Sequence, residues 1–227
     1  LRKIIFFGER LEEKYRAQLD EQGLDYLDRM QRATQRMLNL INSLLTYSRI
    51  STHGQPFRLV DLNQVAREVL SDLEMRIAQT NARIELGELG VIEAQPLQMY
   101  QLFQNLISNG IKFHREGVAP AIKISARQIY QKSAWSDQDQ EYVELTFADN
   151  GIGIEEQYFD RIFKVFQRLH SRNQYEGTGI GLAVCDKIVN QHKGSIRVES
   201  SLGTGSKFIV CLPVHQEQQG GTEIERT

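Results

Sequence analysis

The sequence has few of the residues that build disulfide frameworks, metal clusters or membrane spans. Its only cysteines are Cys185 and Cys211, with no CxxC pair and no histidine at ligand spacing, which argues against disulfides and zinc. The longest apolar runs, such as residues 4–7, are far shorter than the about 18–20 residues that cross a bilayer. Acidic residues interrupt the N-terminal stretch, so no signal peptide is indicated. We therefore expect a soluble, cytoplasmic chain without membrane contact.

Charge of one sign is also scarce. The 27 lysines and arginines nearly balance 29 aspartates and glutamates, giving a net charge of −2. This balance excludes a broad basic surface for nucleic acid or anionic lipid. A composition of 41% hydrophobic and 25% charged residues is ordinary for a globular protein, and 227 residues suffice for one or two domains.

The first 50 residues contain no proline and only two glycines, which favours helices. One helix is expected from about residue 1 to 19, with Gly23 in the following turn. The next segment has a heptad pattern, with one register at Leu27, Thr34, Ile41 and Ser48 and the other at Met30, Met37 and Leu44. This pattern could be the core stripe of an ordinary helix. Because two helices alone bury too little surface, we expect instead a four-helix bundle in a homodimer through residues 1–50, paired by Leu27, Met30, Met37, Ile41 and Leu44.

A polar break at residues 51–56 separates this hairpin from a mixed helix and strand pattern. The expected units are a hairpin at 1–52, a domain at 57–213 and a flexible tail at 214–227. Within the domain, helices are expected at 62–79, 96–114 and 180–192, and strands at 58–62, 82–86, 91–94, 121–129, 141–149, 194–200 and 206–213. The fold class is therefore α+β.

Polar residues are spaced along one face of the expected helix 96–114. Asn105 and Asn109 are four residues apart and Lys112 follows three later, so all three project from the same side. Two amide oxygens and one ammonium suit a hydrated Mg²⁺ and phosphate oxygens. The alternative is a solvated polar face.

Glycines follow one strand and precede one helix. Asp149 ends an apolar strand and is followed by Gly151 and Gly153, which would let a flat ring approach the backbone, although an ordinary turn has the same composition. The run 177–182 reads GxGxGL and leads into a helix, where backbone N–H groups can bind an anion. It is neither GxGxxG nor a Walker P-loop.

The order of these segments resembles the N, G1, F, G2 and G3 boxes of sensor histidine kinases. An Asn-rich helix, an Asp-x-Gly-x-Gly strand end, the run 159–166, GxGxGL and the GxGxxF at 203–208 follow one another at ordinary spacings. Residues 1–50 resemble part of that family's dimerisation and phosphotransfer hairpin, and the opening LRKI with Phe7 is similar to its phytochrome-like branch.

This resemblance implies a Bergerat-type α/β sandwich with a mixed sheet, ATP and Mg²⁺ as ligands, and a response-regulator receiver domain as partner. Asp149 would accept a hydrogen bond from adenine, Asn109 would bind Mg²⁺ and Lys112 would face the phosphates. Residues 150–178 would form a mobile ATP lid. The catalytic residues it implies are Asn105, Lys112 and Arg168, and the nucleotide-binding ones are Asn109, Asp149, Gly151, Gly153, Phe163, Phe166, Gly177, Thr178, Gly179, Ile180, Gly181, Leu182 and Ser206.

The sequence departs from the family pattern in three places. Gly110 replaces the usual alanine, at a helix-propensity cost of about 1 kcal/mol, and Gln95 replaces an aspartate cap. The acceptor histidine is expected about six residues before Leu1, because none of the five histidines lies on the first helix.

Two other functions remain open at this stage. One is a clamp-type ATPase of the gyrase, MutL or heat-shock chaperone kind, which carries a water-activating glutamate where this sequence has Asn105. The other is a nucleotide-binding interaction module without catalysis. Phosphoryl transfer from ATP to a histidine, and onward to a response-regulator aspartate, is the function we expect.

Overall fold

The computed structural model describes residues 1–52, 56–132, 139–169 and 177–216. Parts of the expected linker at 51–56, of the polar segment 131–140 between two expected strands and of the expected lid at 150–178 lie outside the described residues, as does the tail from 217. Among the helices that are described, none is both long and apolar enough to cross a membrane.

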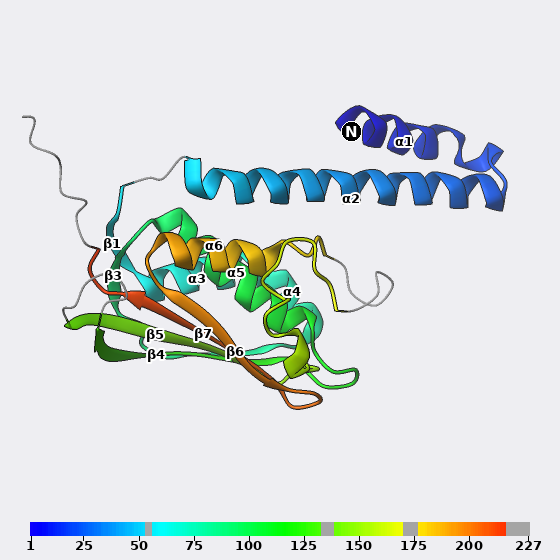
Figure 1. The fold of residues 1–227 in the computed structure, drawn as a ribbon. Coiled ribbons are helices and arrows are strands. Elements are labelled where there is room, and N and C mark those ends of the chain that lie inside the picture. The colour runs from blue at the N-terminus through cyan, green and yellow to red at the C-terminus, as the bar shows by residue number, and fades with distance from the viewer. Residues whose placement is uncertain (53–55, 133–138, 170–176, 217–227) are drawn as a thin grey trace, which may run out of the picture.

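The N-terminal unit is an antiparallel helical hairpin (Figure 1). It consists of α1 (Arg2–Tyr15), the short 3-10 helix η1 (Arg16–Gln18) and α2 (Glu21–Thr52). Gly23 does not form the turn as expected, because α2 begins two residues earlier. The Asp20 carboxylate accepts the Gly23 N–H at 2.7 Å and so satisfies a donor of the first helical turn.

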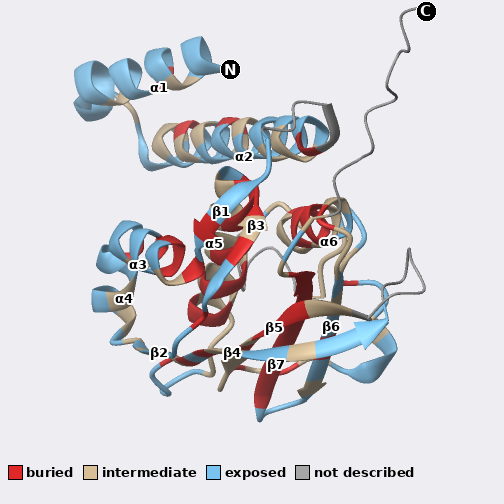
Figure 2. Ribbon diagram, turned by 90° about the vertical axis from the view of Figure 1, so that its left-hand side faces the viewer, coloured by how far each residue is buried: buried red, intermediate tan, exposed pale blue. Residues whose placement is uncertain are grey.

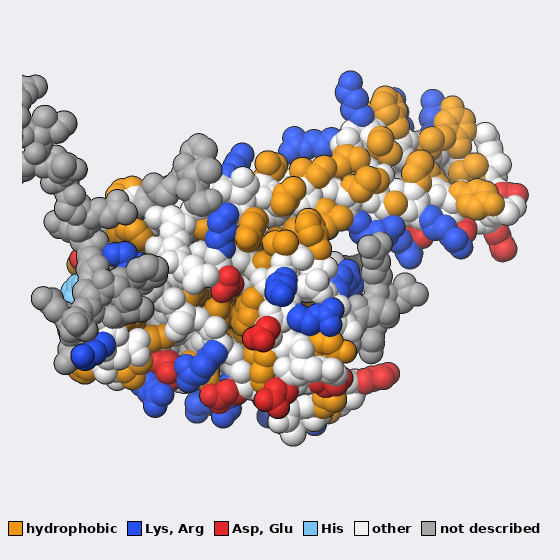
Figure 3. Space-filling view, viewed as in Figure 1, with side chains coloured by type: hydrophobic (Ala, Val, Ile, Leu, Met, Phe, Trp, Pro, Cys, Tyr) orange, Lys and Arg blue, Asp and Glu red, His pale blue; other side chains and the backbone are white. Residues whose placement is uncertain are grey.

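The two heptad registers of α2 have different surroundings. Leu27 and Thr34 are buried within the chain, whereas Met30 and Met37 are exposed. Leu27, which we expect to help pair the two chains, is thus already covered within its own chain. Exposed apolar side chains form a band along the hairpin (Figure 3), which includes Ile4, Phe6, Phe7, Leu11, Met30, Met37, Leu40, Ile41, Leu44 and Leu45.

The α/β domain has a five-stranded mixed sheet in the order β2-β4-β5-β7-β6, in which only β2 and β4 pair in parallel among the described strands. Its strands are β2 (Arg83–Leu86), β4 (Ala121–Lys132), β5 (Asp139–Asp149), β6 (Ser195–Ser201) and β7 (Gly205–Pro213). Two further strands, β1 (Arg58–Asp61) and β3 (Val91–Ala94), form a small antiparallel sheet.

Helices cover one face of the five-stranded sheet (Figure 1). They are α3 (Leu62–Asp72), α4 (Glu74–Thr80), α5 (Pro96–Lys112) and α6 (Gly181–Gln191). The helix expected at 62–79 is interrupted at Leu73, so α4 leaves α3 and contacts α5 separately. The mixed sheet with helices on one face confirms the predicted α/β sandwich.

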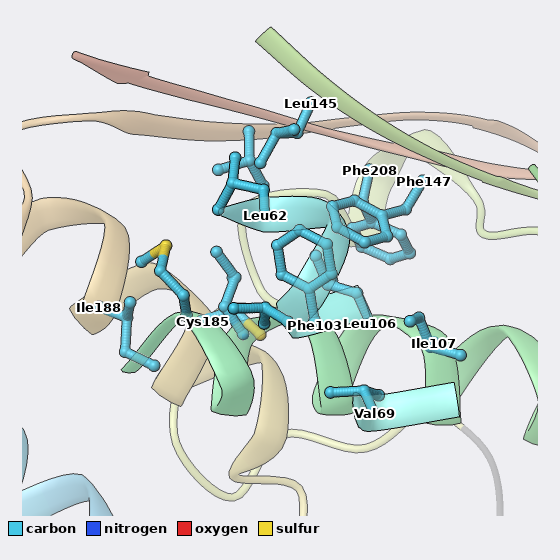
Figure 4. Close-up of a cluster of buried hydrophobic side chains, with 14 of the residues drawn as sticks. Leu62, Val69, Phe103, Leu106, Ile107, Leu145, Phe147, Cys185, Ile188 and Phe208 are labelled. Carbon is cyan, nitrogen blue, oxygen red and sulfur yellow. The ribbon is translucent and has the colours of Figure 1, made fainter. Parts of the chain in front are cut away.

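The core lies between these helices and the sheet (Figures 2 and 4). Phe103 of α5 packs edge-on against Phe147 of β5, with 5.0 Å between the ring centroids. Leu145 and Ile188 are fully buried in the same cluster. Because deleting a buried Phe side chain costs about 3–5 kcal/mol, this contact holds α5 firmly over the end of β5.

Gly110 has a packing reason in the structure. A Cβ at this position would lie 2.8 Å from Ile122 Cδ1 and 3.5 Å from the Asp149 Cβ. The glycine thus lets α5 approach β4 and β5 more closely than alanine would.

The start of α5 is tied to the end of α6 by a buried histidine. Gln95 makes no side-chain cap, in agreement with its weak capping preference, but its backbone N–H donates to His192 Nε2 at 3.2 Å. The other ring nitrogen, Nδ1, lies 2.8 Å from the Ile188 carbonyl oxygen. Burial lowers the pKa of His192, so the ring is held neutral.

The segment after β7 is ordered for three more residues, contrary to the expected flexible tail from 214. The Val214 carbonyl accepts the Glu93 N–H at 2.8 Å and its N–H donates to the Glu141 carbonyl at 2.9 Å. The Gln216 N–H donates to the Glu93 carboxylate at 2.7 Å. The domain therefore extends to at least Gln216.

Candidate nucleotide-binding site

The polar face of α5 forms one wall of the candidate site. Asn105, Ser108, Asn109 and Lys112 are half-buried and all border the same cavity. The opposite face of α5, which includes Leu102, is buried in the core, so the amphipathic pattern of the helix fixes which way the polar side chains point.

Asp149 at the end of β5 lines the cavity. Its Oδ1 accepts the backbone N–H groups of Gly151 at 2.8 Å and Ser206 at 3.1 Å. Burial raises the pKa of Asp149, and these two hydrogen bonds oppose that rise. A Cβ on Gly205, whose φ is +116°, would lie 1.9 Å from the Asp149 carbonyl oxygen, so this strand crossing requires glycine.

The GxGxG run brings backbone close to the α5 side chains. A Cβ on Gly181 would lie 3.2 Å from Asn105 Oδ1, and one on Gly177 would lie 2.8 Å from Lys112 Nζ. Arg168 donates to the Gly177 carbonyl, so two cations meet at this glycine. Lys112 Nζ also stands 4.2 Å from the centroid of the Phe113 ring.

These walls enclose a cavity of about 380 Å³. Twelve of the sixteen residues predicted for the site line it: Asn105, Asn109, Lys112, Asp149, Gly153, Arg168, Gly177, Thr178, Gly179, Gly181, Leu182 and Ser206. Four do not line it: Gly151, Phe163, Phe166 and Ile180. Ile180 is buried in the core, and Phe166 is exposed with a positive φ of +64°.

The cavity has further walls that the sequence analysis missed. An apolar side near Asp149, of the kind that contacts a flat ring, is formed by Phe113, Ile152, Ile154, Ile162, Leu169 and Phe208. Ile162 and Phe208 lie within the runs 159–166 and 203–208 that the sequence had marked, although neither was assigned to the site, and the alternation of Ile152 and Ile154 was a further local signal. Asn39 of α2, Arg76 of α4, Gln167 and Ser108 complete the lining, and no sequence motif marked them.

The hairpin lies against the side of the domain that holds the cavity. Ile50 is buried in the domain core, and Lys187 Nζ donates to the Tyr47 carbonyl at 2.8 Å. A second cavity of about 200 Å³ lies between α2 and the GxGxG run, lined on the α2 side by Asn42, Ser43 and Thr46. It shares Asn105 with the main cavity, so one mouth of the candidate site faces the hairpin.

The donor set of the site suits Mg²⁺ bound together with phosphate. Among the described residues, no group of three or more His, Cys, Asp or Glu side chains could hold a metal alone. The Asn105 and Asn109 amides are oxygen donors, and Mg²⁺ commonly takes few protein ligands, with waters and substrate phosphates completing its shell. The residues present therefore fit this ion.

Comparison with known proteins matches both parts of the chain to family models. Residues 94–216 match the histidine kinase-, DNA gyrase B-, and HSP90-like ATPase family, which is just over half of the chain. Residues 1–53 match the His Kinase A (phospho-acceptor) domain. The chain belongs to the histidine kinase family. The predicted resemblance is thereby confirmed, and with it an ATP-binding domain.

Similar proteins include a phytochrome-like protein and a cyanobacterial phytochrome. Over 94% of its own length, the chain is 38% identical to the phytochrome-like protein Cph1 of Synechocystis. Over the whole of its own length, it is 39% identical to cyanobacterial phytochrome A of Nostoc. It spans 27% and 28% of these relatives. The chain therefore spans about a quarter of the length of these two relatives.

Solved histidine kinases share the fold. Full-length ShkA, solved in complex with AMPPNP, has a TM-score of 0.69 and 21% identity, covering 94% of this chain and 43% of ShkA. The catalytic domain of ThkA has a TM-score of 0.57 and 27% identity, covering 71% of this chain and 97% of that domain. This chain therefore shares its fold with ShkA over nearly its whole length and with the ThkA catalytic domain over about seven-tenths of it.

Proposed function

We propose that this kinase segment binds Mg·ATP and transfers the γ-phosphoryl group to a histidine, from which it passes to an aspartate of a response-regulator receiver domain. The observation that carries the proposal is a single cavity with two unlike ends. One end has an apolar wall and a carboxylate held by two backbone amides, and the other has two asparagines, cations and a glycine-rich run.

The first end suits adenine. Asp149 presents a hydrogen-bond acceptor beside apolar side chains, and a carboxylate can accept the adenine amino group but repels a carbonyl oxygen at the same place. Gly153 has a φ of +74°, and a Cβ there would lie 2.0 Å from the Ser201 carbonyl oxygen, so the loop after Asp149 keeps its shape only with glycine.

The second end suits a triphosphate. Asn109, with Asn105 beside it, would hold Mg²⁺, which neutralises phosphate charge when bound. Lys112 and Arg168 meet at Gly177, where their charges would face the terminal phosphates. Gly177, Gly179 and Gly181 would let the lid backbone wrap the phosphates, with Phe163 and Phe166 as lid aromatics.

In the transfer step, the bond between the γ-phosphorus and the β,γ-bridging oxygen breaks and a nitrogen–phosphorus bond forms on the imidazole. ADP leaves with the electron pair of the broken bond, and an acidic residue beside the acceptor histidine takes the imidazole proton. Residues 1–50 contain no histidine, so the acceptor is supplied from outside them. Positioning and charge neutralisation supply the rate enhancement. Because ATP is a cytoplasmic substrate, we place the reaction in the cytoplasm.

Residue 105 favours transfer to histidine over hydrolysis. An asparagine amide cannot act as a general base toward water, whereas clamp-type ATPases carry a glutamate at this position. The exposed apolar band of the hairpin further favours a four-helix dimer of two chains.

Nucleotide titration with and without Mg²⁺ tests the two ends separately. Asn109→Ala should remove most of the Mg²⁺ dependence of ATP binding, whereas Asp149→Asn should weaken ATP and adenosine binding alike. Asn190→Ala, which changes an exposed amide on α6 outside the cavity, is the matched control and should bind as the unchanged chain does. Unchanged Mg²⁺ dependence in Asn109→Ala would refute the assignment.

A labelling experiment tests the reaction. With γ-labelled ATP the chain itself should hydrolyse slowly and remain unlabelled, whereas a longer chain carrying the upstream histidine should yield acid-labile, base-stable phosphohistidine. Rapid hydrolysis by the present chain would favour a clamp-type ATPase. A longer chain that binds ATP without becoming labelled would favour a nucleotide-binding module.

A further inference from the structure

A cation outside the predicted set borders the nucleotide cavity. Arg76 extends from α4, ahead of the segment matched by the ATPase family model, and lines the cavity together with Asp149 and the α5 polar face. Its Nη1 donates to the Ser108 hydroxyl at 3.0 Å, across 32 positions of the sequence. This bond holds the guanidinium beside the asparagine pair.

The charge around the cavity is unbalanced. Its described lining holds three cations, Arg76, Lys112 and Arg168, against one carboxylate, Asp149. No Asp or Glu within the described ranges forms an ion pair with Arg76, whereas the neighbouring Arg67 of α3 lies 3.8 Å from the Asp61 carboxylate. A guanidinium has five N–H donors in a planar fork suited to phosphate oxygens.

The point at which Arg76 contacts α5 indicates which phosphate its guanidinium would bind. The Phe113 carbonyl accepts the Ile152 N–H at 3.0 Å, so the C-terminal end of α5 adjoins the loop that follows Asp149. Ser108 precedes Lys112 by four residues, and one helical turn rises about 5.4 Å. Ser108, with the Arg76 guanidinium bonded to it, therefore lies about one helical turn farther from the adenine end than Lys112 does, towards Asn105 and the mouth that faces the hairpin.

We infer that Arg76 is a further phosphate-binding residue, which contacts the terminal phosphate of the bound nucleoside triphosphate from α4, together with Lys112 of α5 and Arg168 of the lid. The inference rests on the proposed function, because it assigns a ligand group to the same cavity. Ser108 is the positioning residue that holds the guanidinium in place.

Binding of a ladder of nucleotides tests this inference. Titrations of ATP, ADP and AMP with Mg²⁺ are compared for the unchanged chain, Arg76→Gln, Arg76→Lys and Ser108→Ala. The matched control is Arg83→Gln, which removes one exposed positive charge outside the cavity lining. Thermal denaturation of each variant shows whether the tie between α4 and α5 matters for folding.

Arg76→Gln should weaken ATP binding about tenfold, which corresponds to about 1.4 kcal/mol, should weaken ADP binding less and should leave AMP binding unchanged. Arg76→Lys should recover part of the loss because it restores the charge but not the fork. Ser108→Ala should weaken ATP binding by a smaller factor, and Arg83→Gln should have no effect.

Two outcomes would overturn the inference. One is an Arg76→Gln chain that binds ATP as tightly as the unchanged chain. The other is an equal loss for ATP, ADP and AMP with a lowered melting temperature, which would make Arg76 a purely structural tie. Failure of the proposed function would look different, because the unchanged chain would then bind none of the three nucleotides.

Discussion

Replacing Gly110 with alanine tests how closely α5 must approach the sheet. The new Cβ would lie 2.8 Å from Ile122 Cδ1 and 3.0 Å from Ile122 Cγ1, both too close for carbon atoms in contact. Ile122 is only 3% exposed, so its side chain has little room to move away. Overpacking a core in this way costs about 1–3 kcal/mol.

The substitution also has a favourable effect, which sets the expected net value. Alanine in a helix interior is preferred over glycine by about 1 kcal/mol. We therefore expect Gly110→Ala to lower the free energy of unfolding by about 1 kcal/mol. For a protein of this size that loss lowers the melting temperature by about 2–4 °C.

A compensating substitution separates the clash from other effects. Ile122→Val removes the Cδ1 methyl and should by itself cost about 1 kcal/mol. In the double variant the alanine methyl occupies the vacated space, so its stability should return close to that of the unchanged chain. Urea denaturation of the four proteins gives the coupling energy, which should favour the double variant by about 1–2 kcal/mol.

The same cycle has a functional readout. The Gly110 Cβ position is 3.5 Å from the Asp149 Cβ, so any outward shift of α5 widens the gap between Asn109 and Asp149. Gly110→Ala should therefore weaken ATP binding, and adding Ile122→Val should restore it. A Gly110→Ala chain that melts at a higher temperature than the unchanged chain, with additive effects in the double variant, would refute this reasoning.

Three other predictions concern separate parts of the molecule. The pKa of His192 is lowered in the folded chain, where burial keeps the ring neutral. As the pH falls below about 6.5, the unfolded chain therefore protonates this histidine before the folded chain does. The free energy of unfolding should fall as the pH drops below that value. His192→Gln should flatten this dependence in denaturation series at pH 5.5 and 7.5, and an unchanged slope would exclude His192 as its source. Ile41→Glu should shift sedimentation towards a monomer because it places a charge in the exposed apolar band, while Arg36→Glu on α2 should not. Gly153→Ala should abolish folding or nucleotide binding, because its Cβ would meet the Ser201 carbonyl at 2.0 Å; a normal melting curve with normal affinity would contradict this close approach.

Much of the candidate site could be predicted from the sequence because its determinants are local. The spacing of Asn105, Asn109 and Lys112 places them on one helical face whatever surrounds the helix. The glycines around Asp149 and in the GxGxG run likewise allow backbone conformations that few other residues adopt. The helices and most strands were predictable from their own periodicity, whereas the mixed sheet was expected only from the family resemblance. The order of these segments along the chain was sufficient to indicate the family.

Other features depend on contacts between distant segments, which no local pattern encodes. Leu27 and Met30 are equally apolar in the heptad pattern, and only the packing of the hairpin buries one and exposes the other. Nothing in the sequence distinguishes Arg76 from an ordinary surface charge. The break at Leu73 turns α4 so that the Arg76 guanidinium reaches Ser108. Val214 pairs with Glu93 because β3 ends beside it. Local spacing therefore determined which residues of one segment can act together. Long-range packing decided which residues of other segments join them, because burial and contact depend on where the folded chain brings remote segments.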